Sequence, residues 1–195
     1  MSGAPGGGGL RSRASFLKSF LANPRQVGAV LPTSRSAVRD LLDMADISGA
    51  ETVVEFGCGT GVYTREILNR LAPDARLLAF ELDPNLVRTV EEELGGDERL
   101  QVVNDSAENV SLYLEGCPVE VIVSALPFTS LPQEIRKNIL EQTRQVLDDA
   151  GVFLVLQYSP LVRPYLVRLF DKIDFKFSPV NVPPAFLYAC RKGRG

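Results

Sequence analysis

The 195-residue chain contains no histidine and no tryptophan, and only three cysteines. Without histidine, every mechanism that needs an imidazole is excluded. Cys58, Cys117 and Cys190 lack metal-ligand spacing, and their odd number argues against a disulfide framework. No apolar run approaches the roughly 18 residues that span a bilayer, and Met1–Gly9 lacks the apolar segment of a signal peptide. We therefore expect a reduced, cytoplasmic protein that binds no metal and contacts a membrane only peripherally.

Charge is unevenly distributed along a chain whose net charge is −3. Residues 1–39 contain six basic residues and no acidic one. Residues 40–160 contain 8 basic and 22 acidic residues, and residues 161–195 contain 7 basic and 2 acidic residues. Any single charge is most simply a solvated surface group. The asymmetry as a whole favours an anionic partner, either nucleic acid or a lipid surface.

The first 45 residues differ in pattern from the rest of the chain. Residues 1–11 are glycine-rich and predict a disordered tail. Residues 12–22 have apolar side chains at helical spacing with basic residues beside them, which predicts an amphipathic helix. Ser34 can cap a second helix that runs to about Ala45. We expect residues 12–45 to form a helical arm that either lies on a membrane or closes as a lid, with five membrane residues: Phe16, Leu17, Lys18, Phe20 and Leu21.

From residue 46 onward, short apolar runs alternate with helical patterns, which predicts one α/β domain over residues 46–195. We expect a seven-stranded, mostly parallel sheet with one antiparallel strand and helices on both faces. The predicted strands are 52–56, 76–81, 100–103, 119–124, 152–157, 175–182 and 186–191. The predicted helices are 62–71, 85–94, 132–147 and 160–170.

A glycine-rich loop follows the first predicted strand, in Val53-Val-Glu-Phe-Gly-Cys-Gly-Thr-Gly61. Glycines at alternate positions permit a tight turn and close approach of the backbone to a ligand. Their spacing differs from the dinucleotide pattern G-x-G-x-x-G. Glu55 precedes the loop, and its carboxylate can order the loop or accept from a ligand ammonium. A plain strand–turn–helix connection is the structural alternative.

Acidic residues also stand at the ends of the next two strands. Glu81 lies 20 residues after Gly61 and can accept hydrogen bonds from both hydroxyls of a ribose, with Leu82 against a purine face. Asp105 can accept from an exocyclic amine of adenine, with Ser106 nearby. An aspartate in a loop is more often a turn residue. However, ligands of such sheets bind where the carboxyl ends of the strands meet, and these residues are expected there.

Two further motifs follow the fourth and fifth strands. In Ser124-Ala-Leu-Pro-Phe128, the hydroxyl and the backbone carbonyls can accept from an amine, and Phe128 can meet an ammonium through a cation–π contact. Tyr158 offers a phenol at the same edge of the sheet. The alternatives are a buried phenylalanine and a buried tyrosine.

Together, Glu55, the glycine loop, Glu81 and Asp105 resemble class I S-adenosylmethionine-dependent methyltransferases. The resemblance covers residues 50–191 and implies a Rossmann-like fold with S-adenosylmethionine as the cofactor. The residues expected to bind the cofactor are Ser34, Glu55, Gly57, Cys58, Gly59, Thr60, Gly61, Glu81, Leu82, Asp105, Ser106 and Ser124.

Two branches of these methyltransferases compete for the closer match. The ribosomal RNA adenine dimethylases share the glycine loop and have an Asn-Leu-Pro-Tyr/Phe motif in the region of Ser124–Phe128. The bacterial phospholipid N-methyltransferases are similar over residues 16–190. That similarity includes Val27-Gly-Ala-Val-Leu-Pro-Thr-Ser34, Val123–Phe128, Ser130-Leu-Pro132, Gln157-Tyr158 and Asn181–Ala185, although Ala125 stands where glycine is expected.

The phospholipid branch implies methylation of the phosphatidylethanolamine headgroup towards phosphatidylcholine. We then expect Ser124 and Tyr158 to be catalytic and Leu126, Pro127, Phe128 and Tyr158 to bind the substrate. The enzyme would sit on the anionic inner face of the cell membrane through its basic N-terminal helix, and nucleic acid would not be its partner. Methylation of RNA adenine or of a small-molecule amine is the alternative.

Overall fold

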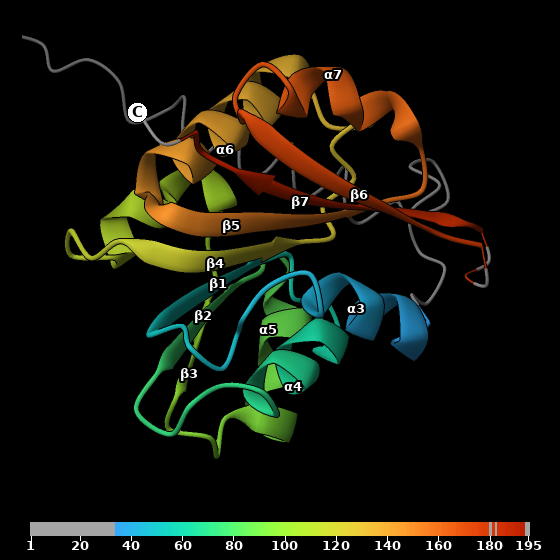
Figure 1. The fold of residues 1–195 in the computed structure, drawn as a ribbon. Helices are drawn as coiled ribbons and strands as arrows, with labels where there is room; N and C mark the ends of the chain where they lie inside the picture. The colour runs from blue at the N-terminus through green and yellow to red at the C-terminus, as the bar shows by residue number, and fades with distance from the viewer. Residues whose placement is uncertain (1–33, 180, 182, 194–195) are drawn as a thin grey trace, which may run out of the picture.

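The computed structural model describes residues 34–193 except 180 and 182. The expected tail and the amphipathic helix at residues 12–22, with Phe16, Leu17, Lys18, Phe20 and Leu21, lie outside the described residues. What is described is a twisted sheet between two layers of helices (Figure 1). This arrangement confirms the predicted fold class.

The sheet has seven strands in the order β3-β2-β1-β4-β5-β7-β6. The first five run parallel, and β7 pairs antiparallel with both of its neighbours, so it is the single reversed strand. The strand order changes direction between β1 and β4, where parallel sheets bind their ligands. The strands are β1 (Thr52–Phe56), β2 (Arg76–Phe80), β3 (Leu100–Val103), β4 (Val119–Ser124), β5 (Leu147–Gln157), β6 (Lys172–Ser178) and β7 (Ala185–Arg191).

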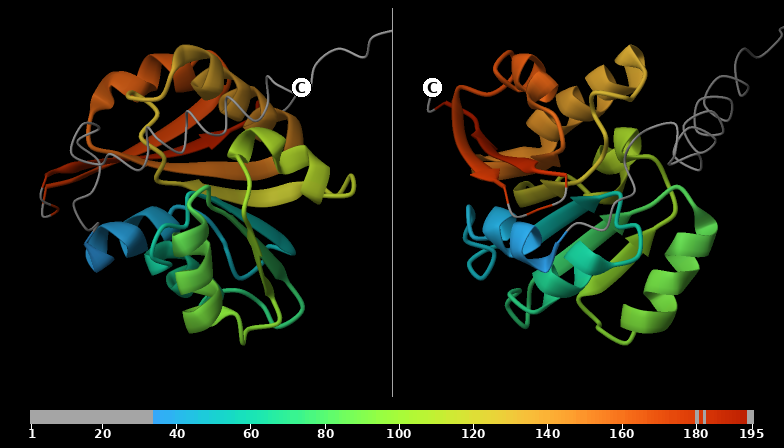
Figure 2. Two further views of the ribbon diagram at one scale, coloured as in Figure 1. Left: turned by 180° about the vertical axis from the view of Figure 1, so that it is seen from behind. Right: turned by 90° about the vertical axis from the view of Figure 1, so that its right-hand side faces the viewer.

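The helices cover both faces of the sheet, as the two views in Figure 2 show. One face carries α3 (Arg35–Leu42), α4 (Val62–Leu68) and α5 (Pro84–Leu94). The other carries η1 (Ala107–Tyr113), α6 (Gln133–Val146), η2 (Pro160–Val162) and α7 (Arg163–Leu166). Alternate residues of β1 enter the two cores: Val53 packs on the α3 side, and Val54 and Phe56 pack on the α6 side. No helix in the described part of the chain is long and apolar enough to cross a membrane.

Helix α3 packs in the domain core, on the other side of the boundary that the sequence predicts at residue 45. Ser34 caps α3 as predicted, because its hydroxyl accepts from the Ala37 amide. Leu41 and Leu42 are completely buried in the core shared with β5 and β7. The second helix of the arm expected at residues 12–45 therefore lies in the layer of helices that covers the sheet.

The bounds of three elements differ most from the prediction. Strand β5 begins at Leu147 instead of Val152, with an irregular register opposite Val119 and Val121. Strand β6 covers Lys172–Ser178 instead of residues 175–182, because its charged first residues pair with β7 at the open edge of the sheet. The helix predicted at residues 160–170 is divided into η2 and α7, each with a proline in its first turn.

Candidate active site

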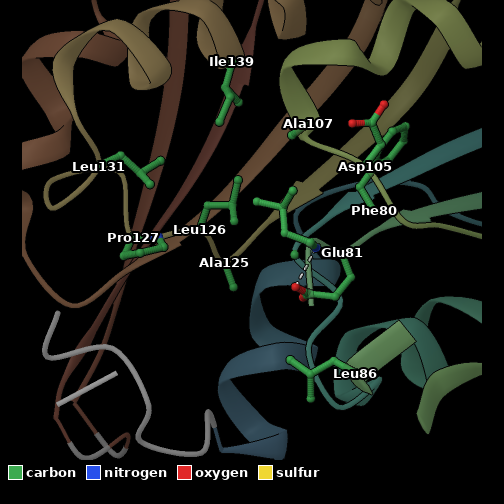
Figure 3. A pocket seen from close by; sticks show the side chains of 12 residues that line it. Phe80, Glu81, Leu86, Asp105, Ala107, Ala125, Leu126, Pro127, Leu131 and Ile139 are labelled. Atoms are coloured by element: carbon green, nitrogen blue, oxygen red, sulfur yellow. Dashed lines mark hydrogen bonds between the residues drawn. The ribbon is translucent and has the colours of Figure 1, made fainter. Parts of the chain in front are cut away.

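A cleft opens at the carboxyl ends of β1, β2, β3 and β4, where the strand order reverses. Figure 3 shows Phe80 and Asp105 on one side of it and Leu126, Leu131 and Ile139 on the other. The cleft is lined by Gly57, Phe80, Glu81, Leu82, Leu86, Asp105, Ala107, Ala125, Leu126, Pro127, Leu131 and Ile139. Two of the three predicted carboxylates, Glu81 and Asp105, therefore meet the predicted proline loop at one place.

The glycine loop presents bare backbone to this cleft. Gly57, Gly59 and Gly61 all have left-handed backbone, with φ of 76°, 55° and 77°. The amides of Gly57 and Cys58 both donate to the carbonyl of Phe80, which fixes the loop to the end of β2. A Cβ at Gly57 would lie 2.8 Å from Leu126 Cδ2, whereas one at Gly59 would meet nothing within 4 Å. The loop thus leaves open space of the kind that a closely held ligand occupies.

Glu81 joins the glycine loop to the loop after β2. Its Oε2 accepts from the Gly59 amide at 3.0 Å, and its Oε1 accepts from the amides of Leu82 and Asp83 at 2.7 and 2.9 Å. These backbone donors hold the carboxylate at the cleft wall. A carboxylate has about four lone-pair positions, and three of those of Glu81 are used here, so Oε2 retains one position for a ribose hydroxyl.

Glu55 is buried beneath the loop and has one unsatisfied oxygen. Its Oε2 accepts from the Thr64 hydroxyl at 2.7 Å, while its buried Oε1 has no partner among the described residues. Burial raises the pKa of Glu55 to about 8, the nearby charge of Glu81 adds to that shift, and the Thr64 hydrogen bond opposes it. A ligand ammonium is a group that would satisfy Oε1 and favour the charged carboxylate.

Asp105 sits in a network built by η1. Asn109 and Tyr113 donate to its carboxylate, and the Tyr113 hydroxyl lies 2.8 Å from Oδ2. The hydrogen bond to Asp105 raises the pKa of Tyr113. Ser106 is used structurally, since its hydroxyl accepts from the Glu108 amide and caps η1. The network holds the Asp105 carboxylate in place at the cleft, and the sequence pattern did not point to Asn109 or Tyr113.

The loop after β4 forms the apolar wall. Ala125, Leu126, Pro127 and Leu131 line the cleft, and the buried Ser124 hydroxyl accepts from the Leu126 amide at 3.2 Å. Among the described residues that line the cleft, the only charged ones are Glu81 and Asp105, on the opposite side. The wall can therefore shelter a neutral, partly apolar acceptor.

Two polar side chains hold this wall from behind. Gln157, at the end of β5, donates to the Leu126 carbonyl at 2.7 Å. Arg136 of α6 is buried, donates to the carbonyls of Phe128 and Leu131 at 3.2 and 3.4 Å, and lies 3.9 Å from the centre of the Tyr165 ring. In the sequence, Gln157 stands out only as part of a motif, and no pattern points to Arg136.

Several predicted site residues lie elsewhere. Phe128 is completely buried and packs edge to face on Phe153, so its ring belongs to the core instead of facing a substrate amine. Tyr158 is partly buried against the core on the α3 side and does not line the cleft. Ser34 caps α3, and Thr60 is an exposed residue of the glycine loop. Burial raises the pKa of Cys58, which keeps that residue a neutral thiol.

Comparison with known proteins decides the family. Residues 53–151 match the model of the family described as "Methyltransferase domain". The chain is also 31% identical, over 180 residues, to the ornithine lipid N-methyltransferase of Singulisphaera acidiphila, covering 90% of this chain and 94% of that protein. This chain belongs to the class I S-adenosylmethionine-dependent methyltransferases.

Two further comparisons show a partial sequence match and a similar fold. It is 30% identical to the ribosomal RNA small subunit methyltransferase A of Pediococcus pentosaceus, but the match covers 63% of this chain and less than half, 42%, of that protein. Its fold is similar to that of the N-methyltransferase NodS of Bradyrhizobium japonicum, crystallised with S-adenosyl-L-homocysteine. That match has a TM-score of 0.69 at 14% identity and covers 93% and 99% of the two chains.

The cofactor is S-adenosylmethionine, and the residues present fit it. The glycine loop leaves room beside Gly59, Glu55 has an unsatisfied buried oxygen, and Glu81 and Asp105 present acceptors along the cleft. Among the described residues, no group of His, Cys, Asp and Glu could hold a metal ion.

Proposed function

We propose that this methyltransferase transfers methyl groups to the headgroup amine of a membrane aminolipid. The observation that carries the proposal is the match to a lipid N-methyltransferase over nearly the whole length of both chains. The apolar cleft wall supports it, because a lipid amine brings apolar groups that such a wall can shelter.

The cofactor side of the cleft has a defined task. Glu55 would bind the amino group of the methionine part, Glu81 the ribose hydroxyls and Asp105 the adenine amine. When bound, S-adenosylmethionine supplies a methyl group on a positively charged sulfur, which accepts the bonding electrons when the methyl leaves. The protein's own contribution is then mainly the orientation of an amine towards that methyl group.

The acceptor amine must be neutral to react. A free alkylamine has a pKa near that of lysine, about 10, so it arrives as an ammonium. An apolar wall without a carboxylate disfavours the charged form and lowers that pKa. Ser124 and Tyr158 stay our candidates for orienting the amine and passing its proton to water. Neither side chain lines the cleft, so each of these roles requires a water in between.

The finer identity of the lipid is open to a direct comparison. The motifs around Ser124 and Gln157 predict phosphatidylethanolamine, and the 31% identical relative acts on ornithine lipid. Both lipids present a primary amine on an acyl-bearing molecule. They differ in that only phosphatidylethanolamine has a phosphate beside it.

The test is incubation of the purified protein with labelled S-adenosylmethionine and each lipid in detergent micelles, followed by lipid extraction and chromatography. We expect label in the lipid fraction as mono-, di- or trimethylated product. Phosphatidylcholine is the matched control, because its quaternary nitrogen has no lone pair and cannot accept a methyl group. Absence of label from both aminolipids would overturn the proposal.

Methylation of an RNA adenine is the second candidate, because a ribosomal RNA methyltransferase is 30% identical over part of the chain. Salt-dependent RNA binding and label in RNA would support that activity. The expected membrane contact through Phe16, Leu17, Lys18, Phe20 and Leu21 accompanies the lipid proposal. Sedimentation of a chain lacking residues 1–22 with anionic vesicles tests it.

A further inference from the structure

Exposed apolar side chains gather in one segment of the methyltransferase. Six large apolar residues of the described chain are strongly exposed, and four of them fall between residues 161 and 177: Leu161, Val167, Phe175 and Phe177. Phe175 and Phe177 are 54% and 46% exposed on the edge strand β6. Grouped apolar exposure of this kind marks an interaction surface more often than scattered single residues do.

The register of β6 and β7 places these phenylalanines on one face. Phe175 pairs with Tyr188, and Phe177 pairs with Phe186. The ring centre of Phe186 lies 6.2 Å from that of Phe175 and 5.3 Å from that of Phe177. We call Phe175, Phe177 and Phe186 the aromatic hairpin patch.

Two arginines that precede β6, rather than the charges of the hairpin itself, favour an anionic neighbour on this face. Because side chains alternate along a strand, Lys172, Asp174 and Lys176 point to the opposite face, where Lys176 pairs with Asp40. On the aromatic side, Arg163 lies close enough to Tyr188 to oppose the rise in the pKa of Tyr188 that burial causes. Arg163 and Arg168 are exposed and form no ion pair with any residue in the described part of the chain.

The patch adjoins the acceptor side of the cleft. Phe186 pairs with Gln157 in the sheet, and Gln157 donates to the carbonyl of Leu126 in the cleft wall. In Figures 1 and 2, the hairpin end of β6 and β7 projects beyond the neighbouring strands. Strand β6 runs in the same direction as β5, so this end lies at the carboxyl edge of the sheet, where the cleft opens.

We propose that the aromatic hairpin patch, with Arg163 and Arg168, docks on an anionic lipid bilayer and sets the cleft at the level of the headgroups. The inference rests on the proposed function, because a lipid acceptor gives the cleft a reason to face the membrane. Phenylalanine side chains enter the boundary between headgroups and acyl chains, and arginines bind the anionic surface. The surface is separate from the N-terminal helix expected from the sequence.

The test is sedimentation of the full chain with vesicles of phosphatidylglycerol and phosphatidylcholine, which contain no primary amine to methylate. The double variant Phe175→Ser/Phe177→Ser should bind these vesicles roughly tenfold more weakly, because it loses apolar area from the interface. Leu112→Ser is the matched control, since Leu112 is a 76% exposed apolar residue of η1, outside the patch. Its binding should stay within about twofold of the native chain.

Two readouts separate docking from folding and from catalysis. The double variant should bind S-adenosyl-L-homocysteine normally and methylate micellar aminolipid normally, but should lose activity on aminolipid in vesicles. Loss of vesicle binding in a chain that methylates neither aminolipid would keep the docking surface and sink the proposed acceptor. Unchanged or tighter vesicle binding by the double variant would overturn the docking surface. So would a change in molecular mass in solution, because it would identify the patch as a contact between copies.

Discussion

The two sides of the cleft differ in chemistry, and we propose that each recognises a different ligand. The cofactor side presents carboxylates from Glu81 and Asp105, with Glu55 buried below them, and each is held by backbone amides or neighbouring side chains. The acceptor side presents Leu126, Pro127 and Leu131 and keeps its polar side chains behind the wall. One side selects by hydrogen bonds, and the other selects by shape and by exclusion of water.

This difference suits the chemistry of an amine acceptor. A carboxylate on the acceptor wall would stabilise the ammonium and raise its pKa. The amine would then be held in the form that has no lone pair to attack with. Arg136 meets carbonyl groups in the described structure, so its charge stabilises the wall without facing the acceptor. At a wall of this kind, little free energy is needed to remove the proton from the bound amine.

The largest expected effect is on the cofactor side, at Glu81. Glu81→Gln replaces one carboxylate oxygen by an NH2 group, which cannot accept a hydrogen bond. Either the Gly59 amide or the amides of Leu82 and Asp83 then lose their acceptor. Charged hydrogen bonds are worth about 1.5–3 kcal/mol each. We therefore expect the affinity for S-adenosyl-L-homocysteine, measured by calorimetry, to fall about 100-fold.

Asp83→Asn is the matched control for Glu81. It removes a negative charge two residues away while keeping a good cap for α5, and the affinity should change less than about threefold. An equal loss in both variants would mean that net charge, rather than the geometry of Glu81, governs cofactor binding.

The acceptor side should respond to Arg136, which we regard as a positioning residue. Arg136→Met keeps the length of the side chain but leaves two buried carbonyls without their donor. We expect the free energy of unfolding to fall by about 2–3 kcal/mol and kcat/KM for the lipid to fall about tenfold. The affinity for S-adenosyl-L-homocysteine should be unchanged, because Arg136 does not touch the cofactor side.

Lys137→Ala provides the comparison for Arg136. The Lys137 side chain is exposed and forms only a weak contact with Glu141 at 3.9 Å. Its removal should therefore change the free energy of unfolding by less than about 0.5 kcal/mol. If Arg136→Met weakened cofactor binding as much as lipid turnover, the two sides of the cleft would not be independent.

The same division explains what the sequence could predict. The cofactor side is built from residues in β1 or just after β2 and β3, so local spacing was enough to select Glu55, Glu81 and Asp105 together. The acceptor wall depends on hydrogen bonds from Arg136 to carbonyls in the loop before α6 and from Gln157 to the Leu126 carbonyl, 31 residues away, which no side-chain motif encodes. Phe128 shows the remaining ambiguity, because an aromatic after a strand fits either a ligand contact or the core, and packing on Phe153 places it in the core.

The fold was predictable to a similar degree. Alternating apolar and helical patterns gave the sheet, its mixed direction and the capping of α3 by Ser34. The burial of Leu41 and Leu42 against β5 and β7 depends on contacts over more than 100 residues, so the domain boundary could not be found from local pattern. The predicted bounds of β6 were displaced towards the C-terminus. Its charged first residues form an ordinary exposed edge strand, but in sequence they resemble a turn.

A smaller effect concerns the charge state of Glu55. Its pKa is raised to about 8 in the folded protein from an ordinary value of 4.5, so the native state holds a proton that the unfolded state has already lost. Stability of the cofactor-free protein should therefore decrease as the pH rises through this window towards 8. The free energy of unfolding, measured by denaturant titration between about pH 6 and 9, should show this decrease in the native chain and not in Glu55→Gln. Glu51→Gln is the control variant and should show the same decrease as the native chain.

Cofactor binding should show the opposite trend for the same reason. A ligand ammonium favours the ionised carboxylate, so the affinity for S-adenosyl-L-homocysteine should rise as the pH approaches 8. Binding should release protons in calorimetry with buffers of different ionisation enthalpy. A pH-independent affinity in the native chain would show that Glu55 does not meet the ligand's ammonium.

The smallest expected effect distinguishes an orienting hydroxyl from an essential base. Tyr158 follows β5, packs against the core on the α3 side and does not line the cleft, so Tyr158→Phe should lower turnover only about fivefold, below the 100-fold or more of a direct proton acceptor. Tyr165→Phe is the control, because it keeps the ring beneath Arg136 and removes only a hydroxyl. Unchanged turnover in Tyr158→Phe would leave Ser124 and water to receive the proton. A fall beyond 100-fold would instead require the acceptor side to close around Tyr158 during the reaction, since its phenol would then touch the amine.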